Sequence, residues 1–304
     1  MPGPTPPSRA FVLGLADADG HVEAGALFEL GAAVGLSTTS VRLAVRRLVD
    51  SGLATSDGRG REAVISLTPA GLAQRAPDLG WTALSYRLDH NAVPWDRQWY
   101  LVSFSVPESA RTGRDALRDY LTELVGAPLA GGLYVSHYDW RPWVHAAATR
   151  HAVASHVTTA STGSLDVGGE RDPRAIAARL WPLAELGDGF DAFVGRWGPI
   201  LDDPPTDLGG AARVVFAMSH DFEELVRRDP VLPAELAPPA WRGAEFRAVY
   251  RRVLATLSAN HPTVARANVF SAYLASIAAA ETMDDATFER WFWHETNPAV
   301  STPG

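Results

Sequence analysis

The stretch LSTTSVRLAVRRLVDSGLATSDGRGREAVISLT, residues 36–68, decides how the N-terminal part of this chain folds. Ser37 can accept a hydrogen bond from the free backbone amides of the turn that follows it, which is typical of a helix N-cap. The apolar residues after it recur at helical spacing, so the stretch predicts an amphipathic helix. The residues expected to form its buried stripe are Val41, Val45, Leu48 and Val49.

A short hairpin is expected directly after this helix. Residues 53–56 and 63–67 have the composition of strands, and the Asp-Gly-Arg-Gly sequence at 57–60 has turn chemistry. Two more helices are expected upstream, and Gly35 is expected to end the second of them. Three helices followed by a hairpin predict a winged helix-turn-helix domain. The two upstream helices are expected over residues 8–16 and 24–33.

The exposed face of the capped helix carries residue types that bind DNA. Hydroxyl groups at a helix start suit phosphate contacts, and arginines one turn later suit guanine edges in a major groove. Arginines in the hairpin turn are expected at the tip of the wing, within reach of the DNA backbone or the minor groove. If this helix is considered by itself, an ordinary solvated amphipathic helix explains its pattern as well as a DNA-binding helix does. The candidate DNA-binding residues are Thr38, Thr39, Arg42, Arg46, Arg47, Arg59 and Arg61.

Composition limits the classes of protein that this chain can be. Its 304 residues suffice for two or three domains, and the absence of cysteine excludes a disulfide framework, a thiolate zinc site and a cysteine nucleophile. It has no apolar run of the kind found in signal peptides or membrane spans, so we expect a soluble, cytoplasmic protein without a membrane partner. The net charge is −8, and residues 8–75 balance seven arginines against seven acids. We therefore expect weak non-specific affinity for nucleic acid.

A second unit is predicted after residue 95. The elements expected there alternate as strand, helix, strand, helix and strand, which predicts a small α+β domain of the ferredoxin-like kind. Tryptophans inside and beyond this unit are expected to be core or interface anchors, because they bury large areas. The five elements are expected over residues 99–106, 108–125, 131–136, 143–155 and 157–161. The tryptophans are Trp95, Trp99, Trp181, Trp197 and Trp241.

Six motifs occur in a fixed order along residues 8–258. They are SVRLAVRRLVDSGL (40–53), WDRQWYLVSFSVPE (95–108), RDALR (114–118), GGLYVS (131–136), LWPLAELGDGFDAFVGRW (180–197) and DPVLPAELAPPAWRG (229–243). Together they resemble the PaaX family, whose members repress phenylacetate-degradation genes and their relatives. The resemblance implies an α+β fold class: a winged helix-turn-helix domain, a ferredoxin-like (Cas2-like) middle domain and a helical C-terminal domain. The boundaries expected on this basis are 1–76, a linker over 77–95, 96–165 and 166–304.

The resemblance also implies a function. It implies a homodimeric transcriptional repressor of double-stranded operator DNA, released by a small effector such as an aryl- or acyl-CoA thioester. The first strand of the middle domain ends in Phe104-Ser105-Val106 without a metal-binding aspartate, so nuclease chemistry is not expected. His137 stands where the family is expected to have proline, and that leaves the conformation of the following loop open. An apolar helix near residues 264–280 is expected beyond the resemblance.

Basic residues of the middle domain are candidates for the effector site. Arg111, Arg114 and Arg118 share one helical face that suits CoA phosphates or a DNA backbone. The simpler alternative is a solvated face with ion pairs to Asp115, Asp119 or Glu123. The candidate effector-binding residues are Arg114, Arg118, His137 and Arg141.

Four histidines provide the main alternative to a regulator. Histidine serves readily as an acid or base near neutral pH, so a PaaX-like scaffold repurposed as an enzyme on a small metabolite would use His137 and His145. Surface or cap histidines are the simpler explanation, and a non-catalytic ligand-binding or interaction module is a third possibility. The histidine spacing fits no zinc motif, and neither a metal nor a cofactor is expected. The four are His137, His145, His151 and His156.

Overall fold

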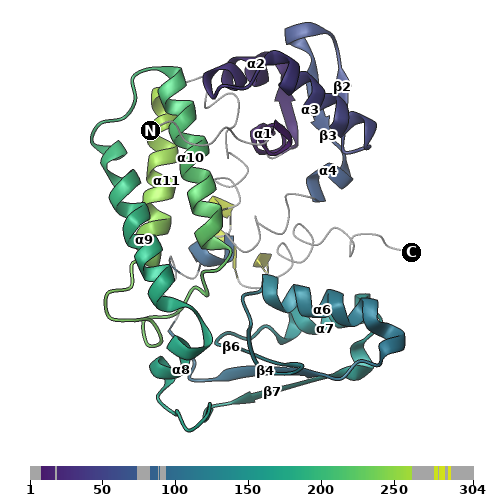
Figure 1. The fold of residues 1–304 in the computed structure, drawn as a ribbon, viewed down its shortest axis with the longest axis vertical. Helices are drawn as coiled ribbons and strands as arrows, with labels where there is room; N and C mark the ends of the chain where they lie inside the picture. The colour runs from purple at the N-terminus through teal and green to yellow at the C-terminus, as the bar shows by residue number, and fades with distance from the viewer. Residues whose placement is uncertain are drawn as a thin grey trace. The chain divides into compact units, whose positions relative to one another are not determined.

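The protein combines helices with antiparallel sheets (Figure 1). It divides into two compact units: residues 1–90, 191–224 and 244–304 form unit 1, and residues 91–190 and 225–243 form unit 2. No helix of the described residues is long and apolar enough to cross a membrane. The computed structural model describes residues 8–17, 19–73, 83–87, 89, 94–261, 277–279, 281–284 and 287–288. Most of the apolar helix expected near residues 264–280 lies outside these ranges.

The N-terminal part of unit 1 contains the three predicted helices and the predicted hairpin. A further strand, β1, pairs antiparallel with β3, so the sheet has the order β1-β3-β2. Strand β1 was not predicted, because three residues are too short to show the alternation of a strand. The elements are α1 (Ser8–Leu15), β1 (His21–Glu23), α2 (Ala24–Ala33), α3 (Thr38–Asp50), β2 (Ala54–Asp57), β3 (Val64–Leu67) and α4 (Pro69–Ala73).

Local signals explain where α3 begins. The Ser37 hydroxyl accepts a hydrogen bond from the Ser40 amide at 3.0 Å, which confirms the predicted cap. Gly35 ends the preceding helix with a φ of 83°, a left-handed conformation that glycine adopts without strain.

The predicted buried stripe of α3 is only partly right. Val41 and Leu48 are buried, but the third buried residue is Ala44, while Val45 is half-buried and Val49 is exposed. Successive helical residues are about 100° apart, so Val49 lies well to one side of Leu48. The face that α3 turns toward α1 and α2 is therefore narrower than the apolar pattern predicted.

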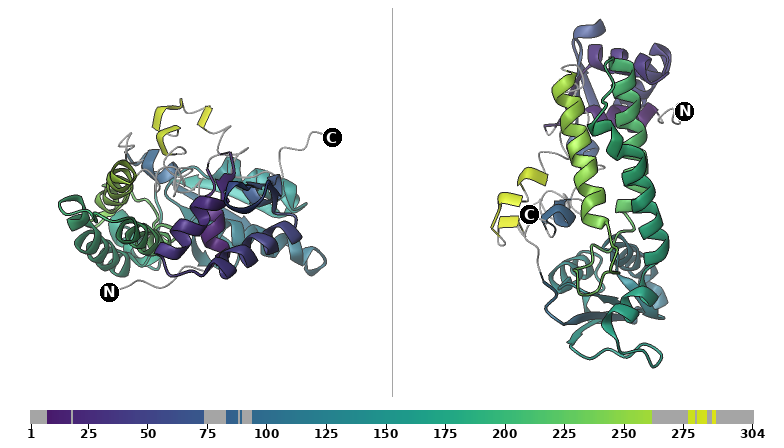
Figure 2. Two further views of the ribbon diagram at one scale, coloured as in Figure 1. Left: turned by 90° about the horizontal axis from the view of Figure 1, so that it is seen from above. Right: turned by 90° about the vertical axis from the view of Figure 1, so that its left-hand side faces the viewer.

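Long helices also belong to unit 1. They are the end of α9 (Leu183–Trp197), α10 (Leu208–Val226) up to residue 224, and α11 (Gly243–Asn260). Figures 1 and 2 show α10 and α11 side by side. Phe222 of α10 stacks on Tyr250 of α11 with ring centroids 3.8 Å apart and on Phe246 at 4.9 Å. Aromatic packing therefore holds these helices together.

A partly buried ion pair ties α11 to a short helical segment. Residues 83–87, inside the segment expected to be a linker, are helical and buried. The guanidinium of Arg247 donates to both carboxylate oxygens of Asp89, at 2.5 and 2.7 Å. The Tyr86 hydroxyl donates to the Arg247 carbonyl at 2.6 Å. Segments far apart in sequence thus share one polar core.

Unit 2 is built on a four-stranded antiparallel sheet with the order β5-β6-β4-β7. The five predicted elements are present, although the second helix ends at Arg150 rather than at residue 155. Strand β5 was missed because it contains Pro128, which lowers strand propensity and is tolerated here on an edge strand. The elements are β4 (Trp99–Phe104), α6 (Arg111–Glu123), β5 (Ala127–Ala130), β6 (Leu133–Ser136), α7 (Arg141–Arg150) and β7 (Val157–Thr162).

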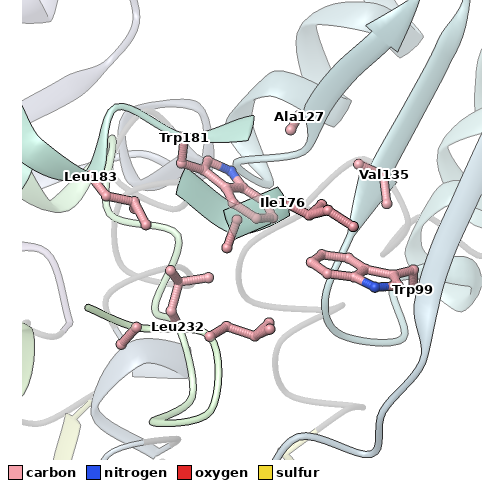
Figure 3. Packing of buried hydrophobic residues seen from close by; sticks show 10 residues of the cluster. Trp99, Ala127, Val135, Ile176, Trp181, Leu183 and Leu232 are labelled. Atoms are coloured by element: carbon pink, nitrogen blue, oxygen red, sulfur yellow. The ribbon is translucent and has the colours of Figure 1, made fainter. Parts of the chain in front are cut away.

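The two faces of this sheet are covered by different elements. Figure 1 shows α6 and α7 together on one face, and the Arg141 guanidinium of α7 lies over the Tyr100 ring. Trp99 precedes Tyr100 in β4 and therefore points to the opposite face. There it packs with α8 (Pro173–Leu180), Trp181 and Leu232, as Figure 3 shows. The five tryptophans expected as anchors are all packed. Trp99, Trp181 and Trp197 are buried, and Trp95 and Trp241 are partly buried against the cluster that contains Trp99.

A glycine in unit 2 provides a test of this packing. A Cβ atom added at Gly126 would lie 2.2 Å from the Trp140 ring, which is fully buried. We expect Gly126→Ala to lower the free energy of unfolding by about 1–3 kcal/mol through overpacking. Gly131→Ala is the matched control, because no atom lies within 4 Å of its added Cβ. Urea denaturation measures both variants, and equal stability of the two would contradict the packing described here.

Candidate nucleic-acid interface

All seven candidate DNA-binding side chains are exposed. On α3, the buried stripe through Val41, Ala44 and Leu48 turns the opposite side of the helix to solvent. Thr39 and Arg46 lie near the centre of that side, and Arg42 and Arg47 flank them. Arg47 also lies in the last helical turn, where a cation interacts favourably with the helix dipole.

Two arginines of α3 have neighbours that orient them. The Nε atom of Arg46 lies 3.6 Å from a carboxylate oxygen of Asp50, one turn further along the helix. Both side chains are highly exposed, so this pair is weak and can open for another partner. The Arg42 guanidinium lies over the ring of Phe28 in α2, 5.4 Å from its centroid. This contact holds Arg42 beside α2.

The turn of the hairpin places its two arginines differently. Arg59 lies between Gly58 and Gly60, which both have positive φ. A 3₁₀ turn, Gly60–Glu62, then brings the backbone toward the start of α2, where a Cβ added at Gly25 would lie 3.1 Å from the Arg61 carbonyl. The backbone of Arg61 therefore lies against α2, and its side chain is exposed.

The candidate effector arginines of unit 2 are ion-paired. Arg114 donates to Glu108 at 2.9 Å, Arg118 to Asp119 at 3.0 Å, and Arg141 to Asp139 at 2.6 Å. Arg118 also contacts Asp115. The expected alternative of a solvated face with ion pairs along the helix is confirmed. An anionic ligand at these arginines has to compete with carboxylates.

His137 and His145 lie in different surroundings. His137 is buried, and its Nε2 lies 2.7 Å from the Pro230 carbonyl, so Nε2 carries the proton and donates it. Burial lowers the pKa of His137 to about 4, which keeps the ring neutral at pH 7. His145 is exposed on α7, with Nε2 3.4 Å from the Thr159 hydroxyl. Within the part of the chain that the structure describes, no group of three potential metal ligands comes together.

The buried His137 makes stability depend on pH. Its folded pKa of about 4 lies below the ordinary value of 6.5, so the unfolded chain binds a proton more readily as the pH falls. We expect this histidine to remove about 2 kcal/mol of stability between pH 7.5 and 5. Urea denaturation of His137→Gln should lack that part of the pH dependence, whereas His145→Gln should keep it. A His137→Gln variant with the wild-type pH dependence would refute the assignment.

One feature of the candidate interface, a set of exposed apolar side chains, was not predicted from the sequence. The large hydrophobic side chains that are exposed in the described ranges are Leu43, Val49 and Val64. Two of them belong to α3 and the third to β3. A helical wheel would have placed Leu43 beside Arg46 and away from Val41, but Leu43 was assigned to neither side of the helix, and Val49 was assigned to the buried stripe.

Comparison with known proteins supports the family resemblance of the sequence motifs. Family models match three successive parts of the chain: "PaaX-like protein" over residues 11–71, "PaaX protein central Cas2-like domain" over 92–177, and "PaaX-like protein C-terminal domain" over 181–267. All three models describe parts of PaaX-like proteins, and they match this chain one after another. The chain belongs to the PaaX family.

Two individual proteins are similar to it. The transcriptional repressor PaaX of Escherichia coli strain K12 is 26% identical over 245 residues, which span 77% of this chain and 75% of that protein. The solved structure of the uncharacterized protein Rv0674 from Mycobacterium tuberculosis has a TM-score of 0.56 at 22% identity. That match covers 85% of this chain and 98% of the other, and it supports the fold.

Proposed function

We propose that this protein is a transcriptional regulator of the PaaX type, a repressor that acts in the cytoplasm and binds double-stranded operator DNA. The observation that carries the proposal is the exposed side of α3, opposite the buried stripe. Arg46 lies near the centre of that side, and Arg42 and Arg47 flank it. Such arginines reach both phosphates and guanine edges from a helix in the major groove. The similarity to a protein named as a transcriptional repressor supports the same function.

The domain arrangement that we propose follows from the order of elements. The succession α1-β1-α2-α3-β2-β3 with the sheet order β1-β3-β2 supports a winged helix-turn-helix, in which α3 is the recognition helix and β2 and β3 form the wing. In unit 2, the order β4-α6-β5-β6-α7-β7 with the sheet order β5-β6-β4-β7 supports a ferredoxin-like domain. A helical C-terminal domain completes the arrangement.

The salt dependence of binding tests the proposal. We expect the full-length protein to bind a DNA fragment from upstream of its own gene and to lose about a thousandfold in affinity between 50 and 200 mM salt. A dimer that makes about six phosphate contacts has this dependence, because binding releases counterions. Fluorescence anisotropy of the labelled fragment measures it, with a scrambled fragment as control. Absence of binding to the upstream fragment at 50 mM salt would overturn the proposal.

We further propose that the regulator is a homodimer on a palindromic operator, released by a small effector such as an aryl- or acyl-CoA. The candidate effector residues remain Arg114, Arg118, His137 and Arg141. Titration of acyl-CoA esters into the protein–operator complex tests this part, with free CoA as control. Release by the ester and not by free CoA is the expected result, and retention of the complex with every ester would contradict it.

A further inference from the structure

The large apolar side chains that are exposed in the described structure belong to two elements of unit 1. Leu43 is 45% exposed, and Val49 and Val64 are each 37% exposed. Among the described residues, no other large hydrophobic side chain is exposed. Single exposed apolar residues are common on protein surfaces, but these three all belong to the proposed DNA-binding elements α3 and β3. Their position calls for an explanation in terms of binding.

Leu43 lies within the proposed DNA-contacting side of α3. Thr39 precedes it by four residues, and Arg46 and Arg47 follow it by three and four. Residues at these spacings are neighbours on a helix surface, with Cβ atoms about 5–6 Å apart. Leu43 therefore has Thr39, Arg46 and Arg47 as its neighbours on the surface of α3.

The charge of these neighbours indicates what covers Leu43. An apolar protein surface would have to desolvate the flanking arginines, whereas DNA supplies anionic phosphates and acceptor atoms for them. In the major groove, the C5 methyl of thymine is the apolar group that a base presents, and apolar side chains contact it. A leucine between an arginine and a threonine hydroxyl matches that pattern.

The contact between Arg46 and Asp50 leaves room for a guanine contact. The Nε atom of Arg46 lies 3.6 Å from an Asp50 carboxylate oxygen, and both side chains are highly exposed, so the pair is weak. When this pair opens, the guanidinium of Arg46 can donate to both O6 and N7 of a guanine. Because Leu43 and Arg46 are about 5–6 Å apart and base pairs rise about 3.4 Å, the two side chains reach bases one or two steps apart.

We infer that Leu43 is a specificity-determining residue that reads the methyl group of a thymine in each operator half-site, within two base pairs of a guanine that Arg46 reads. The inference rests on the proposed function and deepens it, since it names the base chemistry that the operator presents. It assigns Leu43 a role in selecting sequence rather than in general affinity for DNA.

Thymine-to-uracil replacement tests the inference directly. This replacement removes the C5 methyl and leaves base pairing intact. Each thymine of the bound fragment is replaced in turn, and the dissociation constant is measured for the full-length wild type, Leu43→Ala and Val49→Ala. Val49→Ala is the matched control, because Val49 is similarly exposed on α3 but lies about 120° around the helix from Leu43.

Wild type and variants should respond differently to uracil. Replacement of one particular thymine in a half-site should lower wild-type affinity about fourfold, as burial of one methyl group predicts. Leu43→Ala should bind the unmodified operator about as weakly as the wild type binds an operator with uracil in both half-sites, and it should be insensitive to that replacement. Val49→Ala should keep the wild-type sensitivity. Thermal unfolding of both variants should match the wild type, because both side chains are exposed.

Different outcomes overturn different statements. Two outcomes overturn the inference and leave the proposed function in place. In the first, the wild type binds the operator but no thymine is sensitive to uracil replacement. In the second, a thymine is sensitive and Leu43→Ala keeps that sensitivity. A change of oligomeric state in Leu43→Ala, measured by sedimentation, shows that a protein surface covers Leu43 and also overturns it. Failure of the wild type to bind any operator fragment overturns the inference together with the proposed function.

Discussion

Arg46→Ala should weaken operator binding about 30- to 10,000-fold, because each half-site loses a bidentate contact to guanine worth about 1–3 kcal/mol. Arg46 lies near the centre of the exposed side of α3, and its contact with Asp50 is an exposed pair that contributes little to folding. The variant should therefore unfold like the wild type. Anisotropy titration against the operator and against a scrambled fragment measures the loss.

Two control variants make this result specific. Arg46→Lys keeps the charge but lacks the planar fork, so it should retain binding to the scrambled fragment and lose preference for the operator. Arg171→Ala removes an exposed, ion-paired arginine of unit 2 and should leave operator affinity unchanged. Wild-type affinity in Arg46→Ala would show that α3 does not read bases through this residue.

Asp89→Ala should lower the free energy of unfolding by about 3–5 kcal/mol, the largest stability effect that we expect. Arg247 is only 3% exposed, and both of its hydrogen bonds to Asp89 run to a partner 158 residues away in sequence. The substitution removes the carboxylate of Asp89 from a buried guanidinium. Urea denaturation should show a lower midpoint with an unchanged dependence on urea concentration.

An exposed ion pair and a double substitution serve as controls for this prediction. Arg171→Ala breaks the exposed pair with Asp166 and should change stability by less than about 1 kcal/mol. Replacing both partners, as Asp89→Leu with Arg247→Met, should recover much of the loss, because the buried guanidinium is removed together with its carboxylate. If Asp89→Ala lowered the free energy of unfolding by less than about 1 kcal/mol, this would contradict a bidentate pair between Asp89 and the buried Arg247.

Helix α3 shows how far local sequence signals reach. The cap at Ser37 and the left-handed Gly35 were predicted correctly, since both depend on residues within a few positions. The buried stripe was predicted less well, because the choice between Ala44 and Val49 depends on how α1 and α2 pack against the helix. Apolar character alone did not distinguish a buried valine from one turned to solvent.

The missed strands have a related cause. Strand β1 is three residues long and forms only because β3 is available beside it. The two strands are far apart in the sequence, since His21 pairs with Ser66. Strand β5 contains a proline and is stabilised by its pairing with β6. Neither strand has a strong pattern of its own, so only the assembled sheet shows it.

The sequence by itself determined the order of the motifs, the family, the capped helix and its exposed arginines, because these depend on residue types and short-range spacing. The tertiary structure decided which charged and titratable groups remain available to a ligand. It buries His137 against a carbonyl 93 residues away and pairs Arg114, Arg118 and Arg141 with carboxylates. It also leaves Leu43 exposed between Thr39 and Arg46. The physical reason is that burial and pairing depend on segments brought together by folding, which no local pattern encodes.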